Sequence, residues 1–232
     1  MITDNVEQRS LDWYRSRIGN FTGSRISELM KSGRKKEDVF SQTAKSYIYQ
    51  IAAERMFNET FLNDDGVFQD YIDQTSYQTK AMQWGELQED AARKLYKDIY
   101  HPEDILSEVS LCTHDKIPHF AASPDGVIYY DRPNGKTKVL EIKCPNINAF
   151  MLYRTEIHDA ESLKEVKPEY YWQIMAEMAC TSADCATFIT YSPWLQDPLH
   201  VADIERNDED IALMESRVLL ANDMVFNIIN NK

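Results

Sequence analysis

The 232-residue sequence has few cysteines and no long hydrophobic run, and each absence excludes a class of protein. Its four cysteines form no Cys-x-x-Cys pair, and neither Cys180 nor Cys185 has a histidine close by, so no spacing typical of a structural zinc site is present. No apolar stretch approaches the roughly 18–20 residues that cross a bilayer, and residues 1–13 lack the apolar segment of a signal peptide. We therefore expect a cytoplasmic protein with reduced cysteines and no membrane partner.

Glycine and basic side chains are scarce as well. Only 7 glycines are spread over the chain, and no linker or repeat divides it, so we expect a single domain over residues 1–232. Lys and Arg number 25 against 38 Asp and Glu, which gives a net charge of −13. A protein that coats the phosphate backbone of DNA is normally basic. The basic run Arg34–Lys36 is either ordinary surface, which is the commoner case, or a loop that contacts the duplex. The 43% hydrophobic residues suffice for a core and exclude intrinsic disorder.

The first third of the chain shows helical periodicity. Helices are predicted over Ser24–Met30, Ser41–Phe57 and Lys80–Tyr100. The polar segment Asn58–Gln74 between them is predicted to be irregular. The buried stripe of the third helix is predicted to comprise Trp84, Leu87, Ala91 and Leu95.

The middle of the chain changes to β-branched and apolar residues that favour strands, at Ser107–Thr113, Gly126–Tyr130 and Thr137–Lys143. Asn134-Gly135 between the last two indicates a hairpin, because both residues tolerate positive φ. This sequence of elements predicts an α/β (mixed α+β) fold with a central mixed β-sheet flanked by helices. The remaining elements are two helices over about 148–157 and 168–179, two strands over about 186–191 and 200–205, and a closing helix from about 208.

The hairpin carries the acidic residues with the clearest chemical meaning. Folding the chain about its turn places Asp125 opposite residues 142–144, and the two-residue period sends Glu141 and Lys143 to one face of the second strand. Two carboxylates at one end of a hairpin suit a hard divalent cation such as Mg²⁺, and a nearby ammonium group can orient water or offset developing charge. The alternative is a solvated sheet face, and surface charge is what we expect of the similar Glu165-Val166-Lys167.

Pro124-Asp125 and Glu141-x-Lys143 on a strand hairpin resemble the signature of the PD-(D/E)xK nuclease superfamily. Further motifs, in matching order from about residue 13 to the C-terminal strands, are similar to the phage lambda exonuclease family of viral recombination nucleases. These motifs are Trp13-x-x-x-Arg17-Ile18-Gly19, Thr22-Gly23-Ser24, Trp84-Gly85-x-x-x-Glu89, Ser123-Pro124-Asp125-Gly126, Leu140-Glu141-Ile142-Lys143-Cys144-Pro145 and a helix-borne Gln173.

The resemblance implies a restriction-endonuclease-like core with a metal-dependent active site. Asp125 and Glu141 would bind the metal together with the carbonyl oxygen of Ile142, Glu89 would be the family's helix-borne acid and a further metal ligand, and Lys143 would position or activate the water. A helical wheel supports Glu89 independently, because the residue lies at the border of the predicted apolar stripe, where it can face a cleft.

The resemblance also implies a pocket for the 5′-phosphate of a DNA end, at the positions of Arg17, Ser24, Ser123 and Gln173. A guanidinium group can contact a phosphate through two hydrogen bonds, and hydroxyl and amide groups add neutral donors. Three alternatives stay open: Arg17 is a surface cation, Ser24 caps the helix that starts near Arg25, or Arg25 is the phosphate ligand instead.

The activity that the resemblance implies is a Mg²⁺-dependent 5′→3′ exonuclease, with Mn²⁺ tolerated. It would degrade one strand of linear double-stranded DNA to 5′-mononucleotides and leave 3′ single strands for recombination by annealing. The resemblance further implies a homotrimeric ring, a single-strand annealing protein as partner, and a phage or prophage origin in a bacterial cytoplasm. The alternatives are another PD-(D/E)xK nuclease, such as an endonuclease or a nuclease subunit of a repair complex, and a module that binds DNA ends without cutting them.

Overall fold

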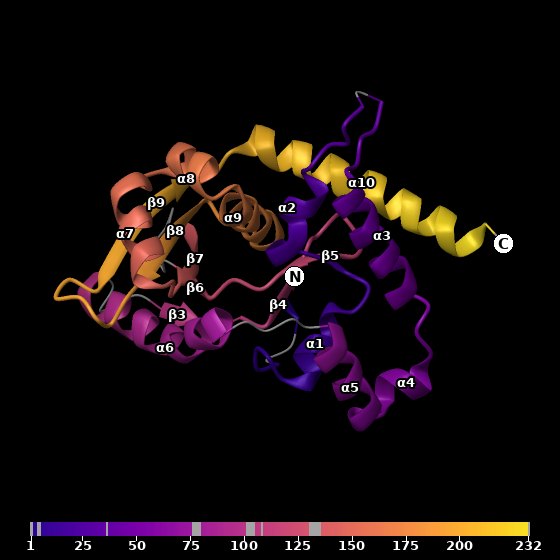
Figure 1. Cartoon of the computed structure of the whole chain (residues 1–232), viewed down its shortest axis with the longest axis horizontal. Helices are drawn as coiled ribbons and strands as arrows, with labels where there is room; N and C mark the ends of the chain where they lie inside the picture. The colour runs from indigo at the N-terminus through magenta and orange to yellow at the C-terminus, as the bar shows by residue number, and fades with distance from the viewer. Residues whose placement is uncertain are drawn as a thin grey trace.

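The computed structural model describes residues 2–3, 6–35, 37–75, 80–100, 105–107, 109–129 and 136–231, so Tyr130 and the turn predicted at Asn134-Gly135 lie outside the described residues. Helices and strands alternate in a mixed α/β fold, as predicted (Figure 1). The helices are α1 (Leu11–Arg17), α2 (Ile26–Leu29), α3 (Gln42–Glu54), α4 (Glu59–Asn63), α5 (Asp65–Thr75), α6 (Lys80–Tyr100), α7 (Ile147–Glu156), α8 (Ala160–Val166), α9 (Pro168–Thr181) and α10 (Asp208–Asn230). The strands are β1 (Ile2–Thr3), β2 (Phe21–Thr22), β3 (Ile105–Ser107), β4 (Leu111–Thr113), β5 (Phe120–Ala122), β6 (Gly126–Tyr129), β7 (Thr137–Lys143), β8 (Cys185–Tyr191) and β9 (Leu199–Glu205).

The larger sheet has the strand order β3-β6-β7-β8-β9. Strands β7 and β8 run parallel in it, with Lys143 paired to Thr190, and the other neighbouring strands are antiparallel. A parallel pair needs a long crossover connection, which α7, α8 and α9 provide. Because parallel strands end at the same edge of a sheet, the end of β7 at Lys143 lies beside the end of β8.

A second, smaller sheet has the order β1-β4-β5-β2. The prediction of one strand over Ser107–Thr113 is therefore wrong, because β3 belongs to the larger sheet and β4 to the smaller one. Val109 and Ser110, which precede β4, are both buried. A continuous apolar run carries no signal for such a change of sheet.

Helices cover both faces of the larger sheet. Along β7, Val139 points into the main core with residues of α9, whereas Leu140 and Ile142 point into a smaller core with Ala92 and Tyr96 of α6. Figure 1 shows α6 below these strands and the long α10 across the top of the molecule, over α2 and α3. The two-residue period puts Glu141 and Lys143 on the same face of β7 as Val139, so they lie on the side of the sheet that α9 covers, and packing holds both elements in place.

The predicted buried stripe of α6 is wrong in its orientation. The helix turns Glu89 inward, where arginine side chains pair with its carboxylate, and a hydrophobicity pattern does not register paired charges. Leu87 is consequently 75% exposed, and Ala91 also faces solvent. The described residues of α6 that are buried are Glu89, Ala92 and Tyr96, while Trp84 and Leu95 are half-buried.

Two segments are more regular than expected. Residues Asn58–Gln74 are not irregular but form most of α4 and α5, with Asn58 capping α4 by accepting a hydrogen bond from the N–H of Phe61 at 2.8 Å. Only Phe68 and Ile72 of α5 are buried, so its apolar pattern is weak in the sequence. Glu165-Val166-Lys167 lies at the C-terminal end of α8, and Glu165 is exposed, as expected of surface charge.

Other expectations concern the surface and the cysteines. None of the described helices is both long and apolar enough to cross a membrane. All four cysteines are free thiols, as expected. Arg34 and Lys35 are exposed, and Lys36 lies outside the described residues.

Two substitutions on opposite faces of α6 test its orientation. Leu87→Ala should change the free energy of unfolding by less than about 0.5 kcal/mol, because this side chain is mostly in solvent. Ala92→Leu adds bulk at a position with no exposed surface and should destabilise the protein by about 1–3 kcal/mol. Urea unfolding followed by circular dichroism measures both, and a larger loss from Leu87→Ala would contradict this orientation.

Candidate active site

The start of β6 and the end of β7 bring three of the four predicted catalytic residues together, namely Asp125, Glu141 and Lys143. Asp125 immediately precedes β6, and its N–H donates to the carbonyl oxygen of Leu140 at 3.0 Å. In return, the N–H of Ile142 donates to Asp125 Oδ2 at 2.7 Å. These two bonds hold the Asp125 carboxylate against β7, where Glu141 and Lys143 share one face.

The strand register differs from the expected one. Gly126 pairs with Leu140 and Tyr129 with Thr137, so the pairing is centred near position 133 rather than on Asn134-Gly135. Asp125 therefore lies level with Glu141, not with residues 142–144. The expectation assumed pairing centred on Asn134-Gly135, whereas the observed pairing is centred between one and two residues earlier in the chain. This register places Asp125 and Glu141 directly opposite each other, closer together than predicted.

Glu141 is completely buried, at 0% exposure. Lys143 Nζ forms an ion pair with Glu141 Oε1 and lies 5.0 Å from the centre of the Tyr170 ring. Burial lowers the pKa of Lys143, but the negative charges of Glu141 and Asp125 outweigh burial and raise that pKa. Lys143 therefore stays a cation, and it can contribute charge and hydrogen-bond donors.

A further buried carboxylate, Glu177 on α9, lies against Glu141 and is absent from the predicted site. It is 1% exposed, and its Oε1 accepts a hydrogen bond from Gln173 Nε2 at 3.1 Å. Burial raises the pKa of Glu177 well above its usual range, and the charge of Glu141 adds to this effect. The same two causes raise the pKa of Asp125. The signal that the sequence offers for Glu177 is an acid among apolar residues of a helix. A glutamate in such a position stands out, because glutamates are rarely buried unless they are paired.

Glu89 lies on the other side of Asp125 and is bound to two arginines. Arg93 Nη2 donates to Glu89 Oε1 at 2.9 Å, and Arg9 Nη2 donates to Oε2. Arg93 Nε also donates to the carbonyl oxygen of Asp125 at 3.0 Å, so one side chain links α6 to the start of β6. The expectation that Glu89 faces inward agrees with its burial, but both of its oxygens are engaged by guanidinium groups. Its role as a metal ligand stays a prediction.

The donor set at Asp125 and Glu141 fits a divalent cation. Both residues offer hard oxygen ligands, and a divalent cation would compensate the negative charge that is buried at Glu141 beside Lys143. Across the described ranges, no three carboxylate, imidazole or thiolate groups converge closely enough to hold a metal ion. Mg²⁺, however, is usually held by one or two carboxylates together with waters and the phosphates of a substrate. Two protein carboxylates therefore suffice if DNA supplies further ligands.

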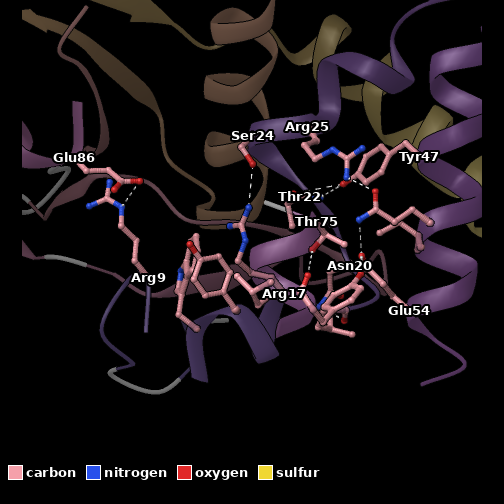
Figure 2. Close-up of a pocket in the computed structure, with 17 residues that line it drawn as sticks. Arg9, Arg17, Asn20, Thr22, Ser24, Arg25, Tyr47, Glu54, Thr75 and Glu86 are labelled. Carbon is pink, nitrogen blue, oxygen red and sulfur yellow. Dashed lines mark hydrogen bonds and ion pairs between the residues drawn. The ribbon is translucent and has the colours of Figure 1, made fainter. Parts of the chain in front are cut away.

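A second cluster, around Arg17, opens onto a cavity of about 540 Å³ (Figure 2). Arg17 Nη2 donates to Ser24 Oγ at 3.0 Å, and Nη1 donates to Ser123 Oγ at 3.4 Å. Its guanidinium carbon lies 4.2 Å from the centre of the Trp13 ring, and Trp13 Nε1 also donates to Ser123 Oγ at 3.2 Å. Burial lowers the pKa of Arg17 to about 10, and no described carboxylate forms an ion pair with it. This cation is therefore suited to an incoming anion.

The alternatives for this cluster are decided by the partners of each residue. Arg25 also lines the cavity, but its Nε is bound to Glu28 Oε1 at 2.7 Å and its Nη1 to Gln50 Oε1 at 2.7 Å. Ser24 lies within a 3₁₀ helix, Gly23–Arg25, and the helix α2 that follows has no side-chain cap. Ser24 is thus a partner of Arg17 rather than a cap.

Gln173 forms its side-chain hydrogen bond outside the Arg17 cluster, and its role in phosphate binding stays a prediction. Three of the four predicted phosphate-binding residues come together, namely Arg17, Ser24 and Ser123. The side chain of Gln173 is engaged with Glu177 on the same helix, beside the carboxylates. The helical step of four residues explains this contact.

Comparisons with known proteins find a matching family model and similar solved structures. The family model of the YqaJ-like viral recombinase domain matches residues 12–184. The chain is similar to a solved alkaline exonuclease, LHK-Exo from Laribacter hongkongensis, with 26% identity and a TM-score of 0.72 over 96% of this chain and 95% of that chain. A structure of LHK-Exo in complex with dAMP gives 27% identity and a TM-score of 0.73 over the same shares. A phage-related exonuclease from Haemophilus somnus 129PT shares the fold, with 17% identity and a TM-score of 0.59 over 91% of this chain and 96% of that chain.

A search of curated proteins finds no match. The matched segment contains the Arg17 cluster, the acidic hairpin and Gln173. The resemblance to viral recombination nucleases predicted from these motifs is confirmed by the family match and by the similarity to LHK-Exo. The chain therefore belongs to the YqaJ-like viral recombinase domain family.

Proposed function

We propose that this chain is a metal-dependent exonuclease that removes 5′-mononucleotides from one strand of linear double-stranded DNA. The observation that carries the proposal is the short connection between the two clusters. Ser123 is hydrogen-bonded to Arg17, and it precedes the carboxylate of Asp125 by only two residues. Two extended residues span at most about 7 Å. A 5′-phosphate held at Arg17 would therefore bring the next phosphodiester of the same strand to the carboxylates, and cleavage there would release one nucleotide.

The residues of the two clusters divide the work. Arg17 and Ser24 would bind the terminal phosphate, which carries more charge than an internal diester. Asp125 and Glu141, with the carbonyl oxygen of Ile142, would hold the divalent cation, which lowers the pKa of a bound water and neutralises charge on the leaving oxygen. Lys143, a buried cation beside Glu141, would orient that water and stabilise the negative charge that develops on the phosphate. Mg²⁺ is the proposed metal, and Mn²⁺ would be tolerated.

The similarity to LHK-Exo supports exonuclease activity, because it extends over nearly the whole of both chains at 26–27% identity. One of those structures contains dAMP, a mononucleotide of the kind that the proposed reaction releases. The membership of a viral recombinase family supports a role in recombination, in which 3′ single strands would pass to a single-strand annealing protein in the bacterial cytoplasm.

The resemblance to the lambda exonuclease family supports a homotrimeric ring around the DNA. Light scattering after size-exclusion chromatography should then give three times the chain mass of 27.0 kDa. A monomer across the micromolar range would remove the ring from the proposal and leave the chemistry of the single chain untouched.

Two other functions would give different products. An endonuclease of the PD-(D/E)xK group would cut covalently closed circular DNA, which has no end for Arg17 to bind. A module that only binds DNA ends would release no nucleotides from linear duplex with Mg²⁺, although the carboxylates and Lys143 are present. A time course on end-labelled linear duplex and on closed circles, with Mg²⁺ or with chelator, distinguishes these functions.

Lys143→Ala should lower turnover of linear duplex by at least about 100-fold, because it removes a positioned charge from the transition state. Binding of the DNA end should stay largely intact. Single-turnover rates on end-labelled duplex and fluorescence anisotropy with the same duplex measure the two effects. Lys94→Ala, which removes an exposed lysine of α6, is the control. Retained turnover in Lys143→Ala would remove this residue from the mechanism.

Arg17→Ala should reduce the preference for 5′-phosphate over 5′-hydroxyl ends by about 10- to 100-fold, since a hydrogen bond to a charged group contributes about 1.5–3 kcal/mol. Arg17→Lys should recover part of the preference, because the charge remains but the two-pronged contact is lost. The ratio of kcat/KM on the two ends measures the effect. Arg25→Ala is the matched control, since Arg25 lines the same cavity but is paired with Glu28. A loss of preference in Arg25→Ala alone would assign the phosphate to Arg25.

A further inference from the structure

Two tryptophans from different elements stack on each other at the surface of the protein. The rings of Trp84, on α6, and Trp194, in the loop between β8 and β9, are nearly parallel, with an interplanar angle of 9° and centroids 5.5 Å apart. Trp84 is half-buried, whereas Trp194 is 71% exposed. One face of the Trp194 ring therefore covers Trp84, and the other face is presented to solvent. A large aromatic side chain in this position is typical of a surface that binds a partner.

The loop that carries Trp194 is held in a defined shape. At its base, the N–H of Ser192 donates to the carbonyl oxygen of Pro198 at 2.9 Å. Near its end, Arg154 of α7 donates to the carbonyl oxygen of Asp197 at 3.1 Å. These contacts, together with the ring stack, fix the orientation of the exposed tryptophan.

The Trp84–Trp194 pair lies close to the sheet edge that carries the proposed catalytic residues. Strand β8 ends beside β7, with Thr190 paired to Lys143, and Trp194 follows Thr190 by four residues. Four extended residues span at most about 14 Å. On α6, Trp84 precedes Glu89 by five residues, which is about 7.5 Å along the helix axis. The pair is therefore about two to four base steps of DNA, at roughly 3.4 Å each, from the site.

The charge of the loop favours contact with a base over contact with a phosphate. The loop segment 192–198 contains Asp197 and no lysine or arginine, so it offers no cation to a phosphate. A nucleobase is flat and uncharged, and stacking tolerates every sequence because every base has an aromatic face. An enzyme that removes nucleotides of any sequence needs a contact of this kind.

We propose that the exposed face of Trp194 stacks on an unpaired nucleobase at the end of a DNA duplex. The inference rests on the proposed function, because that function brings a duplex end to the carboxylates near the pair. When the end of one strand enters the site, its bases separate from those of the other strand and lose their stacking in the duplex. Trp194 would supply a replacement stacking partner. The base comes from the cleaved strand or from the 3′ strand that remains, and both offer the same chemistry.

The first test measures binding of a labelled duplex with a short unpaired fork by fluorescence anisotropy, in chelator so that no cleavage occurs. Trp194→Ala should weaken binding at least about fivefold, as for the loss of one stacked base. Trp194→Leu, which keeps apolar bulk but has no flat face, should weaken binding as much, and Trp194→Phe should recover part of it. Phe226→Ala, which removes a 65% exposed aromatic side chain of α10, is the matched control and should bind like the parent.

Abasic DNA separates stacking from other contacts and identifies the strand. Removing the bases at the 5′ end or at the 3′ end of the fork leaves every phosphate in place. One of these changes should weaken binding to the parent at least about fivefold and have little further effect on Trp194→Ala, because the two changes remove the same contact. Intact DNA should also quench the tryptophan fluorescence of the parent, and this quenching should be smaller in Trp194→Ala.

Three results would overturn the stacking role: unchanged binding of intact DNA by Trp194→Ala, equal losses in the parent and in Trp194→Ala on both abasic DNAs, or a smaller assembly mass of Trp194→Ala in light scattering. The last result would assign the exposed ring to contact with a second copy of the chain. Because Trp194 is largely in solvent, its variants should fold like the parent, and equal Tm values verify this. Failure of the proposed function is a separate outcome. The parent would then release no nucleotides from linear duplex with Mg²⁺, while the abasic comparison in chelator would still report stacking.

Discussion

The burial of the Glu141 carboxylate in the middle of the larger sheet is the constraint on which the rest of the site depends. Strand β7 is paired on both sides, and the N–H of Ile142 near its end donates to Asp125 rather than to Glu141. The side chain must therefore find its compensation from side chains around it, and Lys143, two residues further on the same face, is the nearest cation. The Glu-x-Lys spacing therefore follows from the two-residue period of the strand, which places the lysine on the same face as the buried carboxylate.

The arginines near the two clusters show how an acidic protein can offer an anion site. Arg9 and Arg25 are each neutralised by carboxylates, whereas Arg17 is held by two hydroxyl groups and an aromatic ring. The positive charge of Arg17 is therefore directed at the cavity without being cancelled. The net charge of −13 describes the whole chain and says little about this pocket. What matters for an anion is which cation has neutral partners.

Much of the hairpin was predictable from the sequence, because its chemistry follows from short-range rules. The alternation of β7 gives the common face of Glu141 and Lys143, and the closeness of Ser123 to Asp125 in the chain keeps the two clusters together. The residues of α9 predicted the helix itself. They did not predict that Glu177 on this helix would contact Glu141, because the two residues are 36 positions apart in the chain.

The orientation of α6 and the division of the predicted strand Ser107–Thr113 could not be predicted from periodicity, because both depend on distant residues. The inward face of α6 is set by the pairing of Glu89 with Arg9 and Arg93, and such pairing cancels the polarity that a wheel would count as outward. The division of the predicted strand Ser107–Thr113 depends on which sheet each half can join, and that choice is made by distant strands. Local pattern predicts the type of an element well, whereas its neighbours decide which way it faces.

The neutral partners of Arg17 have a consequence for how degradation would proceed along a strand. Hydrolysis that frees the 3′-oxygen of the terminal nucleotide leaves the phosphate on the next one, so each cut creates the group that the pocket binds. The enzyme would have to recognise a foreign end only once, and every later end would be one that it had made itself. A guanidinium group that is free of carboxylate competitors can release one phosphate and take up the next without first breaking an internal ion pair. The pocket would then act as a ratchet that advances by one nucleotide with each turnover.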